Sequence, residues 1–267
     1  MQTDTMFISF GEAQSAIRVG RPSLIIDVRP RRDFEATAEM IQGALRRDPE
    51  RVAGWAGELP KASRVIAYCA DGTNVSQRIA EALNEVGISA RYLQGGFESW
   101  KAEGGALDRK PAGAATRWVT RERPKIDRIA CPWLIQRFAD PEAEFIYVPP
   151  QEVLAAAKER DATPYDIPEV HFSHEGERCS FDAFLKHYRL TDPALDQLAV
   201  IVRGADTARL ELAPQSAGLA AISLGLSRNF GDDHEMLRHG MLMYDALYTW
   251  CKGGQDEVHT WNPAAYR

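Results

Sequence analysis

The sequence has few cysteines, no long apolar run and no excess of positive charge. Its 267 residues include only four widely spaced cysteines, which excludes a disulfide framework and favours a reducing, cytoplasmic setting. No apolar stretch approaches the roughly 20 residues of a membrane-spanning helix, and the first residues lack the pattern of a signal peptide. The net charge of −6 disfavours nucleic acid as a partner. We therefore expect a cytoplasmic globular protein with free thiols and no membrane partner.

Histidine is absent from the first 170 residues, although the chain holds six, and charge is spread unevenly. Residues 1–108 carry 13 basic and 15 acidic side chains, whereas residues 109–128 carry seven basic and two acidic ones. A PAGAA segment beside this change is typical of a linker. We expect one domain over residues 1–108, a basic linker over 109–124 and a second domain over 125–267.

The first domain shows the pattern of alternating strands and helices. Short apolar runs at 22–30, 64–70 and 90–96 have the length of buried strands. Between the last two, apolar residues repeat at helical spacing, and Gly87 fits the position just beyond a helix. A strand, a helix and a strand of these lengths indicate a parallel crossover. We expect an α/β domain in which helices flank a central parallel sheet, with its chemistry at the carboxyl ends of the strands.

Cys69 ends the second of these strands, and a short loop of small or polar residues separates it from the helix. The loop residues are Ala70, Asp71, Gly72, Thr73 and Asn74. Amides of such a loop can curl toward the sulfur, and the helix adds the positive end of its dipole. Both effects favour a thiolate, which is a nucleophile. The alternative is a buried cysteine that serves as a small apolar side chain.

Two segments of this domain resemble the rhodanese (sulfurtransferase) family over roughly residues 5–108. IIDVRPRRDFEATAEMIQGAL is similar to the family's Asp-Val-Arg region, and YCADGTNVSQRIAEALNEVGISARYLQGGFESW is similar to its active-site loop, helix and Gly-Gly-aromatic ending. The resemblance implies that Cys69 takes a sulfane sulfur from a small-molecule donor as a persulfide. It passes this sulfur to a thiophilic acceptor, and no cofactor is required. The six residues from Cys69 to Asn74 match the loop length of the sulfur-transferring branch.

One position departs from the family pattern, and two others that match it have an alternative role. The family loop commonly ends in arginine, whereas this loop ends in Asn74, an amide that cannot neutralise a dianion. We therefore expect weak use of thiosulfate and better use of a persulfide or another donor of low charge. Asp27 and Arg29 fall on the Asp-Val-Arg region. They are candidates for substrate binding or, alternatively, an ion pair that ties a strand to a loop.

The second domain has apolar spacing that predicts mainly helices with a few short strands, an α+β class. KIDRIACPWLIQRFADPEAEFIYVPP, FSHEGERCSFDAFL and LAVIVRGAD resemble the C-terminal domain of the chromate-resistance regulator family, over about 116–252. The resemblance implies an association with chromate resistance and makes chromate or another oxyanion a candidate ligand. In the regulators a different N-terminal region precedes this domain, so DNA binding does not carry over.

His174, Cys179 and Asp206 are candidates for a zinc or iron site in this domain, because imidazole and thiolate suit such ions. His174 and Cys179 flank a polar EGER turn that could bring them together. The alternative makes His174 a hydrogen-bonding residue of a turn and Cys179 a buried residue at a helix start.

Lys125, Arg128 and Arg203 could line an oxyanion pocket, since guanidinium groups suit tetrahedral oxyanions. The alternative is a solvated face with surface ion pairs. The sequence as a whole favours a sulfurtransferase that acts through Cys69. The other function it allows is a non-catalytic chromate or redox sensor, or a transcriptional regulatory protein.

Overall fold

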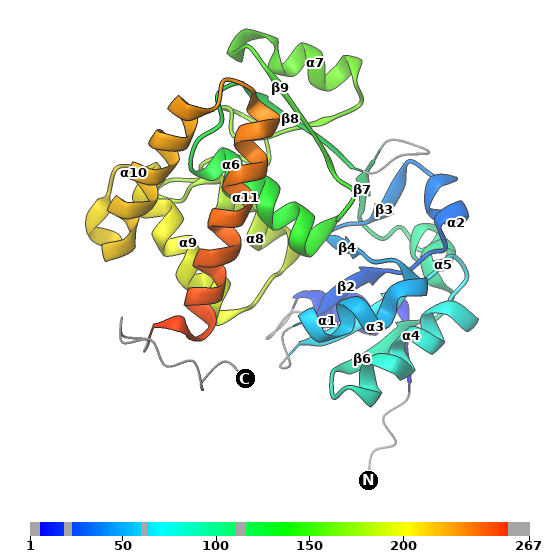
Figure 1. Cartoon of the computed structure of the whole chain (residues 1–267). Helices are drawn as coiled ribbons and strands as arrows, with labels where there is room; N and C mark the ends of the chain where they lie inside the picture. Colours follow the sequence, from blue (N-terminus) through cyan, green and yellow to red (C-terminus); the bar gives the residue numbers. More distant parts are fainter. Residues whose placement is uncertain (1–5, 19–22, 60–62, 111–115, 256–267) are drawn as a thin grey trace.

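The computed structural model describes residues 6–18, 23–59, 63–110 and 116–255, which form two domains joined near residue 110 (Figure 1). The part of the predicted linker at 111–115 lies outside the described residues. In the described ranges, none of the helices is both long and apolar enough to cross a membrane.

The first domain is built on a five-stranded sheet in the order β1-β6-β5-β2-β4, and all neighbouring strands run parallel. The strands are β1 (Phe7–Ile8), β2 (Leu24–Asp27), β4 (Ala44–Arg46), β5 (Arg64–Tyr68) and β6 (Ser89–Leu93). The helices are α1 (Phe10–Arg18), α2 (Arg31–Glu35), α3 (Val52–Trp55), α4 (Asn74–Glu85) and α5 (Gly96–Ala102). The predicted parallel sheet and crossover helix are confirmed, with β5 at the centre of the sheet.

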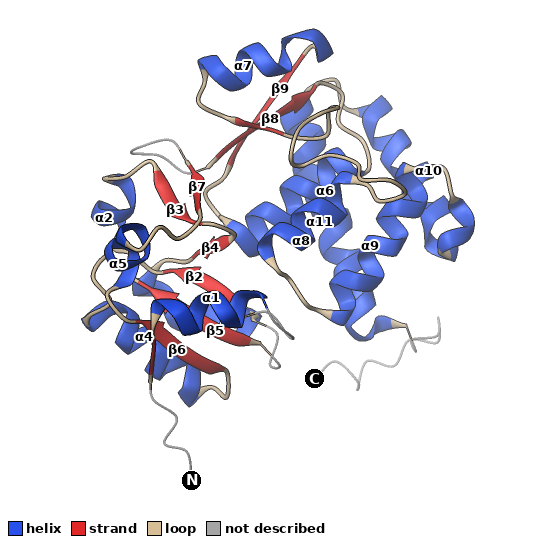
Figure 2. Ribbon diagram, turned by 180° about the vertical axis from the view of Figure 1, so that it is seen from behind, coloured by secondary structure: helices blue, strands red, loops and turns tan. Residues whose placement is uncertain are grey.

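Alternation along β5 divides the core of this domain into two layers. Ile66 and Tyr68 pack in one cluster with residues of α1 and α5, whereas Val65 and Ala67 pack in another with residues of α3 and α4. Successive strand residues point to opposite faces of a sheet, so both faces are covered by helices (Figure 2). This cover leaves the ends of the strands as the accessible part of the sheet.

The second domain is mainly helical and also has a small parallel sheet in the order β10-β8-β9. Its strands are β8 (Arg117–Arg121), β9 (Glu144–Val148) and β10 (Thr163–Pro164). Its helices are α6 (Asp127–Leu134), α7 (Val153–Glu159), α8 (Ser180–Tyr188), α9 (Pro193–Asp206), α10 (Pro214–Asn229) and α11 (Asp233–Thr249). Strand β8 falls inside the predicted linker 109–124, which corrects that boundary. The strand begins and ends with arginine, which made it resemble a basic linker. Its central residues Trp118 and Val119 are buried, at 4% and 0% exposure.

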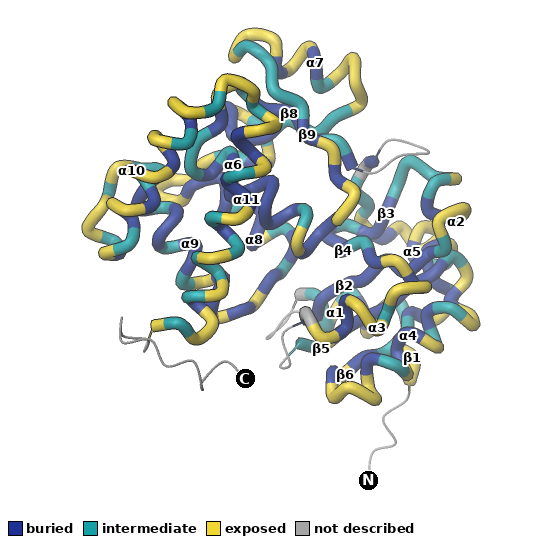
Figure 3. Tube along the Cα trace, viewed as in Figure 1, coloured by how far each residue is buried: buried dark blue, intermediate teal, exposed yellow. Residues whose placement is uncertain are grey.

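Helix α6 lies in the interior of this domain, and a proline shapes its second half. Pro132 has no N–H to donate, so the carbonyl of Arg128 loses its usual helical partner. The hydroxyl of Tyr165 donates to that carbonyl instead, at 3.4 Å. A π-helical turn, η3 (Ile135–Ala139), follows directly. Most residues of α6 are buried (Figure 3), and its first residue, Asp127, is also held inside the domain.

The two domains meet beside the antiparallel pair β3 (Glu39–Ile41) and β7 (Leu107–Arg109). Asp108 on β7 accepts hydrogen bonds from the amide of Gly43, at 2.7 Å, and from Nε2 of His187 on α8, also at 2.7 Å. Arg189 donates to the carbonyl of Gln42 at 3.0 Å. A pocket of about 410 Å³ opens at this junction, and neither candidate site contributes to its lining.

Candidate functional site

Cys69 directly follows the central strand β5, and its side chain is buried at 2% exposure. Its Sγ lies 3.2 Å from Oγ of Ser76, 3.5 Å from Oδ1 of Asp71 and 3.5 Å from the carbonyl of Thr73. In the described structure, the thiol is thus oriented toward hydrogen-bond acceptors, and no loop amide donates to the sulfur. The sequence-based expectation of an amide cradle is wrong for this state of the loop.

The side chain of Asp71 explains this difference. Its Oδ1 accepts hydrogen bonds from the amide of Thr73 at 3.1 Å and from the hydroxyl of the same residue at 2.7 Å, so an amide expected to face sulfur faces a carboxylate. These bonds lower the pKa of Asp71, with the hydroxyl as the largest cause. Asp71 is exposed and therefore places a fixed negative charge beside the sulfur.

The loop around Cys69 is held by contact between two glycines. Gly72 has φ +71° and Gly96 has φ +56°, a region that favours glycine. A Cβ on Gly96 would lie 2.4 Å from the amide nitrogen of Gly72, which is too close for any side chain. Four of the five predicted loop residues, 70–73, therefore lie in a tightly packed connection from β5 to α4. Asn74 begins α4 and is exposed.

Asp27 and Arg29 form an ion pair beneath this loop, with side-chain exposures of 0% and 1%. Arg29 Nη2 lies 2.6 Å from Asp27 Oδ2, and the hydroxyl of Tyr68 donates to the same oxygen at 2.7 Å. The Arg29 guanidinium also lies 4.4 Å from the ring centre of Phe97. Both charges are buried and paired with each other, and they connect β2, β5 and α5 in the core; among the described residues, Arg29 Nη1 has no hydrogen-bond partner. The geometry favours the tying role over contact with substrate.

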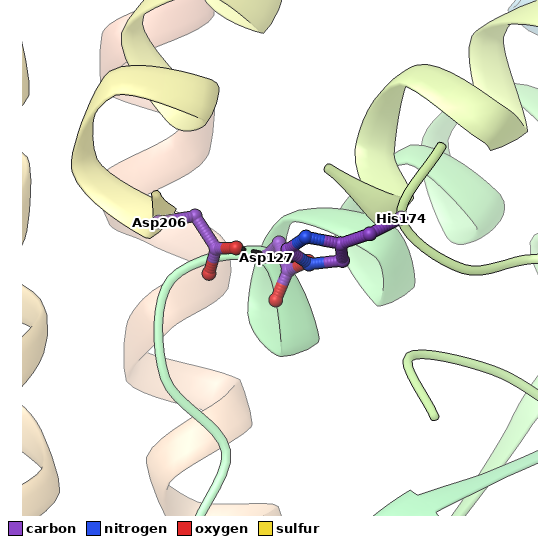
Figure 4. Close-up of side chains that lie close together, drawn as sticks. All are labelled: Asp127, His174 and Asp206. Carbon is purple, nitrogen blue, oxygen red and sulfur yellow. Dashed lines mark ion pairs between the residues drawn. The ribbon is translucent and has the colours of Figure 1, made fainter. Parts of the chain in front are cut away.

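A second group of functional side chains lies in the C-terminal domain, around the imidazole of His174. Its Nε2 is 3.4 Å from Asp127, 3.4 Å from Asp166 and 3.2 Å from Asp206, each measured to a carboxylate oxygen. Asp127 begins α6, Asp206 ends α9, and His174 lies in the loop before α8 (Figure 4). One nitrogen and two of these carboxylates, those of Asp127 and Asp206, have donor atoms within 4.8 Å of one another, a spacing suited to a shared cation.

Electrostatic effects in this group are strong because the carboxylates are buried. Burial raises the pKa of Asp127. Burial and the neighbouring charge of Asp127 raise the pKa of Asp206 to about 8. The carboxylates, that of Asp127 first, raise the pKa of His174 to about 10. Asp166 differs, because His174 and Arg121 outweigh its burial and lower its pKa. Asp127 and Asp206 thus share a hydrogen bond with each other and both face the imidazole of His174.

The structure brings His174 and Asp206 together as predicted but puts Asp127 where Cys179 was expected. Cys179 is fully buried at the start of α8, and its Sγ lies 3.6 Å from Oδ2 of Asp182. Burial raises the pKa of this thiol far above its usual range, so it stays protonated. The alternative of a buried residue at a helix start describes Cys179, because its backbone amide is needed for the helix cap.

Asp127 and Asp166 were missed by the sequence analysis. Asp127 stands between cationic residues in KIDR, and that segment drew attention to its positive charge. Asp166 lies in an irregular stretch and has a positive φ of 52°. No local spacing connects either of them with His174, although an aspartate in the first turn of a helix is a signal for a buried cap or ligand.

The predicted oxyanion residues do not form a pocket. Arg203 donates from Nε to Asp182 at 3.0 Å, and Arg128 Nε lies 3.2 Å from Asp166. The side chain of Lys125 has no ion pair or hydrogen bond within the described ranges. The two guanidinium groups form ion pairs with carboxylates on different elements, because the interior of the domain contains several aspartates. This corrects the interpretation of the three cations as one anion site.

Comparison with known proteins agrees with the two-domain division. The model of the ChrB C-terminal domain matches residues 118–251, and that of the rhodanese-like domain matches residues 9–103. Protein ChrB of Cupriavidus metallidurans is 31% identical over 134 residues, which cover 50% of this chain and 40% of that protein. The chain thus spans less than half the length of that relative.

Other similar proteins correspond to the first domain alone. Thiosulfate sulfurtransferase GlpE of Coxiella burnetii is 36% identical over 83 residues, which cover 31% of this chain and 75% of that protein. Among solved structures, a rhodanese-like domain protein from Staphylococcus aureus is 26% identical, with a TM-score of 0.35. It covers 40% of this chain and 99% of that chain.

Proposed function

The chain belongs to the ChrB C-terminal domain family and carries a rhodanese-like domain in front of it, and on this premise we propose that it is a sulfurtransferase associated with chromate resistance. In this proposal Cys69 receives a sulfane sulfur as a persulfide and passes it to a thiophilic acceptor. The donor is a small molecule.

The position of Cys69 carries this proposal. It lies at the carboxyl end of the central strand of an open parallel sheet, which is where such folds place their ligands. The contact between Gly72 and Gly96 fixes the loop that surrounds it. The match to the rhodanese-like domain, residues 9–103, includes this region. Position and loop support the same nucleophile.

The reaction needs no change in overall oxidation state. Cys69 loses its proton, and Sγ attacks the outer sulfur of a persulfide donor. A bond forms between Sγ and that sulfur, the sulfur–sulfur bond of the donor breaks, and the donor leaves as a thiolate. A thiophilic acceptor then attacks the terminal sulfur and Cys69 departs as a thiolate. Asp71, which faces Sγ at 3.5 Å and is exposed, gives the thiol proton a route to solvent.

The charge around the loop favours a donor of low charge. Asp71 contributes a negative charge beside Sγ, and Asn74 contributes no positive one. Thiosulfate is a dianion and would meet an uncompensated carboxylate. Since the relative is named for thiosulfate, that compound is the natural comparison for a persulfide donor.

The test uses the full chain incubated with the persulfide of a cysteine ester, which carries no net charge, or with thiosulfate, followed by cyanolysis and mass measurement. We expect the mass of one added sulfur atom, release of thiocyanate with cyanide, and a faster reaction with the persulfide. Cys69→Ser should show neither, while Cys251→Ser, a buried cysteine of the other domain, should behave as the natural chain does. Equal labelling of Cys69→Ser and the natural chain would contradict the proposal.

A second function is a regulatory protein in which the state of Cys69 is sensed and not turned over. One observation favours it: Asp108 of the first domain is bonded directly to His187 of the second, which gives a physical route between them. In that case a single sulfur would add to Cys69 without turnover, and hydrogen exchange in α8 would change. Multiple turnovers with unchanged exchange would exclude it.

A further inference from the structure

The imidazole of His174 and the carboxylates of Asp127 and Asp206 converge from three separate segments of the C-terminal domain (Figure 4). Neither a helix face nor a single loop creates this arrangement, because Asp127 begins α6 and Asp206 ends α9. Asp166 stands behind them, with one of its oxygens also 3.4 Å from His174 Nε2. Three side chains capable of binding metal therefore converge, and Asp166 contacts one of them.

The distances are those of ligands around an ion and not those of hydrogen bonds. Nε2 of His174 lies 3.2 to 3.4 Å from oxygens of three carboxylates, whereas a charged N–H···O bond is usually about 2.7–2.9 Å. One ring N–H can be directed at one oxygen only. In contrast, ligand atoms bound at about 2.1 Å stand about 3.0 Å apart in an octahedron and about 3.4 Å apart in a tetrahedron. The observed separations fall in that range.

A cation at this point would also lower the cost of burying the carboxylates. Asp127 and Asp206 have side-chain exposures of 2% and 14%, and buried carboxylates are costly unless they are paired. Asp166 is compensated by Arg121 at 2.7 Å and by the hydroxyl of Ser180 at 2.9 Å. Asp127 accepts one long bond from the amide of Ser180, at 3.3 Å. Asp127 and Asp206 otherwise face the imidazole and share a hydrogen bond with each other, a contact that a divalent cation would replace.

We propose that Asp127, His174 and Asp206 bind one divalent first-row transition ion of the oxygen-preferring kind, Mn²⁺ or Fe²⁺, with Asp166 as a partner that orients His174. Carboxylate oxygens favour manganese and iron, and a single imidazole is compatible with both. The thiols of Cys131 and Cys179 are fully buried and are not among the converging groups, so a thiolate zinc site does not fit. This inference is independent of sulfur transfer.

The site is accessible from one side, which suits exchange of the ion and binding of water. The side chain of His174 is 42% exposed, while the carboxylates lie deeper. Three protein ligands leave coordination positions open, as in catalytic or sensing sites rather than closed structural ones. A small oxygen ligand could therefore bind directly to the ion.

The test is a titration of the chelator-treated full chain with Mn²⁺. Binding is measured as the loss of the electron paramagnetic resonance signal of the free ion. We expect one ion per chain. Asp206→Asn and His174→Gln keep the size of each side chain and should each weaken binding at least ten-fold. His234→Ala removes an exposed histidine of the same domain and should bind as the natural chain does.

Two results would overturn the proposal. The first is no Mn²⁺ or Fe²⁺ binding by the natural chain. The second is unchanged binding by both Asp206→Asn and His174→Gln, which would place the ion elsewhere. Preference for Zn²⁺ with exclusion of Mn²⁺ would overturn the assignment of the ion. Far-ultraviolet circular dichroism of each variant establishes that it is folded, and His174→Gln provides the decisive comparison because that side chain is partly exposed.

Discussion

The site around Cys69 comes from one continuous stretch of chain, whereas the group around His174 comes from three stretches separated by whole helices. In the first, backbone geometry does most of the positioning, through glycines that no other residue can replace. In the second, side chains of opposite charge hold one another in a buried space. A site defined by the backbone depends on shape, and a site defined by side chains depends on charge. Substitutions should therefore affect the two in different ways.

The largest effect should come from Cys69→Ser, which separates the two regions most sharply. We expect sulfur transfer to fall by at least about a thousand-fold, because a hydroxyl is a far weaker nucleophile than a thiol. Binding of Mn²⁺ should not change. Persulfide-dependent cyanolysis and the manganese titration measure the two quantities on the same sample. A parallel loss of metal binding would show that the regions are not independent.

Gly96→Ala tests whether the backbone positions the first site. Its Cβ would meet the amide of Gly72 at 2.4 Å, and its φ of +56° is unfavourable for alanine. We expect a loss of roughly 2–4 kcal/mol in the free energy of unfolding, measured by urea denaturation. Gly11→Ala is the matched control, because a Cβ there meets nothing within 4 Å and φ is ordinary. Equal stability of the two variants would argue against a rigid loop.

Asn74→Arg tests the electrostatic side of the same loop. A guanidinium at the start of α4 would offset the charge of Asp71 and bind a dianion. We expect thiosulfate turnover to rise about ten-fold, which corresponds to about 1.4 kcal/mol, with little change for a neutral persulfide ester. Asn74→Gln serves as the uncharged control. High thiosulfate activity in the natural chain, unaffected by the arginine, would refute this account of donor choice.

The smallest effect concerns the junction and its dependence on pH. Burial and the neighbouring His187 lower the pKa of His171, so the unfolded chain binds this proton more readily. Stability of the junction should therefore decline as pH falls below about 6.5, the usual value for histidine. Burial opposes the charge of Asp108, but bonding to His187 outweighs it and lowers its pKa. That contribution is lost only below about pH 4.

The measurement is hydrogen exchange of α8 between pH 5 and 7.5, corrected for intrinsic rates. His171→Gln should reduce the change in this window. Lys186, whose positive charge also opposes protonation of His171, should remain in place. An identical pH profile in the variant and the natural chain would exclude His171 as the titrating group.

The contrast between the two sites also explains what the sequence revealed. Cys69 and its loop were found because a strand, a turn and a helix follow one another in a local pattern, and the parallel sheet follows from the same alternation. The group around His174 was half found. Asp206 and His174 were named, but Asp127 was hidden among cations and is brought to them only by the packing of α6 against α8, α9 and α11. The orientation of the Cys69 thiol could not be predicted from a local pattern either, because it depends on where the Asp71 carboxylate lies.

Asp108 lies at the end of the first domain, a few residues before the chain enters the second at Thr116. The domain that carries its partner His187 is therefore tethered to it by a short covalent connection. In the language of effective concentration, such a tether presents each partner to the other at about millimolar levels or above. A contact too weak to hold two separate molecules together can then keep these domains docked. The junction needs only modest intrinsic affinity, and lengthening the connection would dilute it without altering a single contact residue.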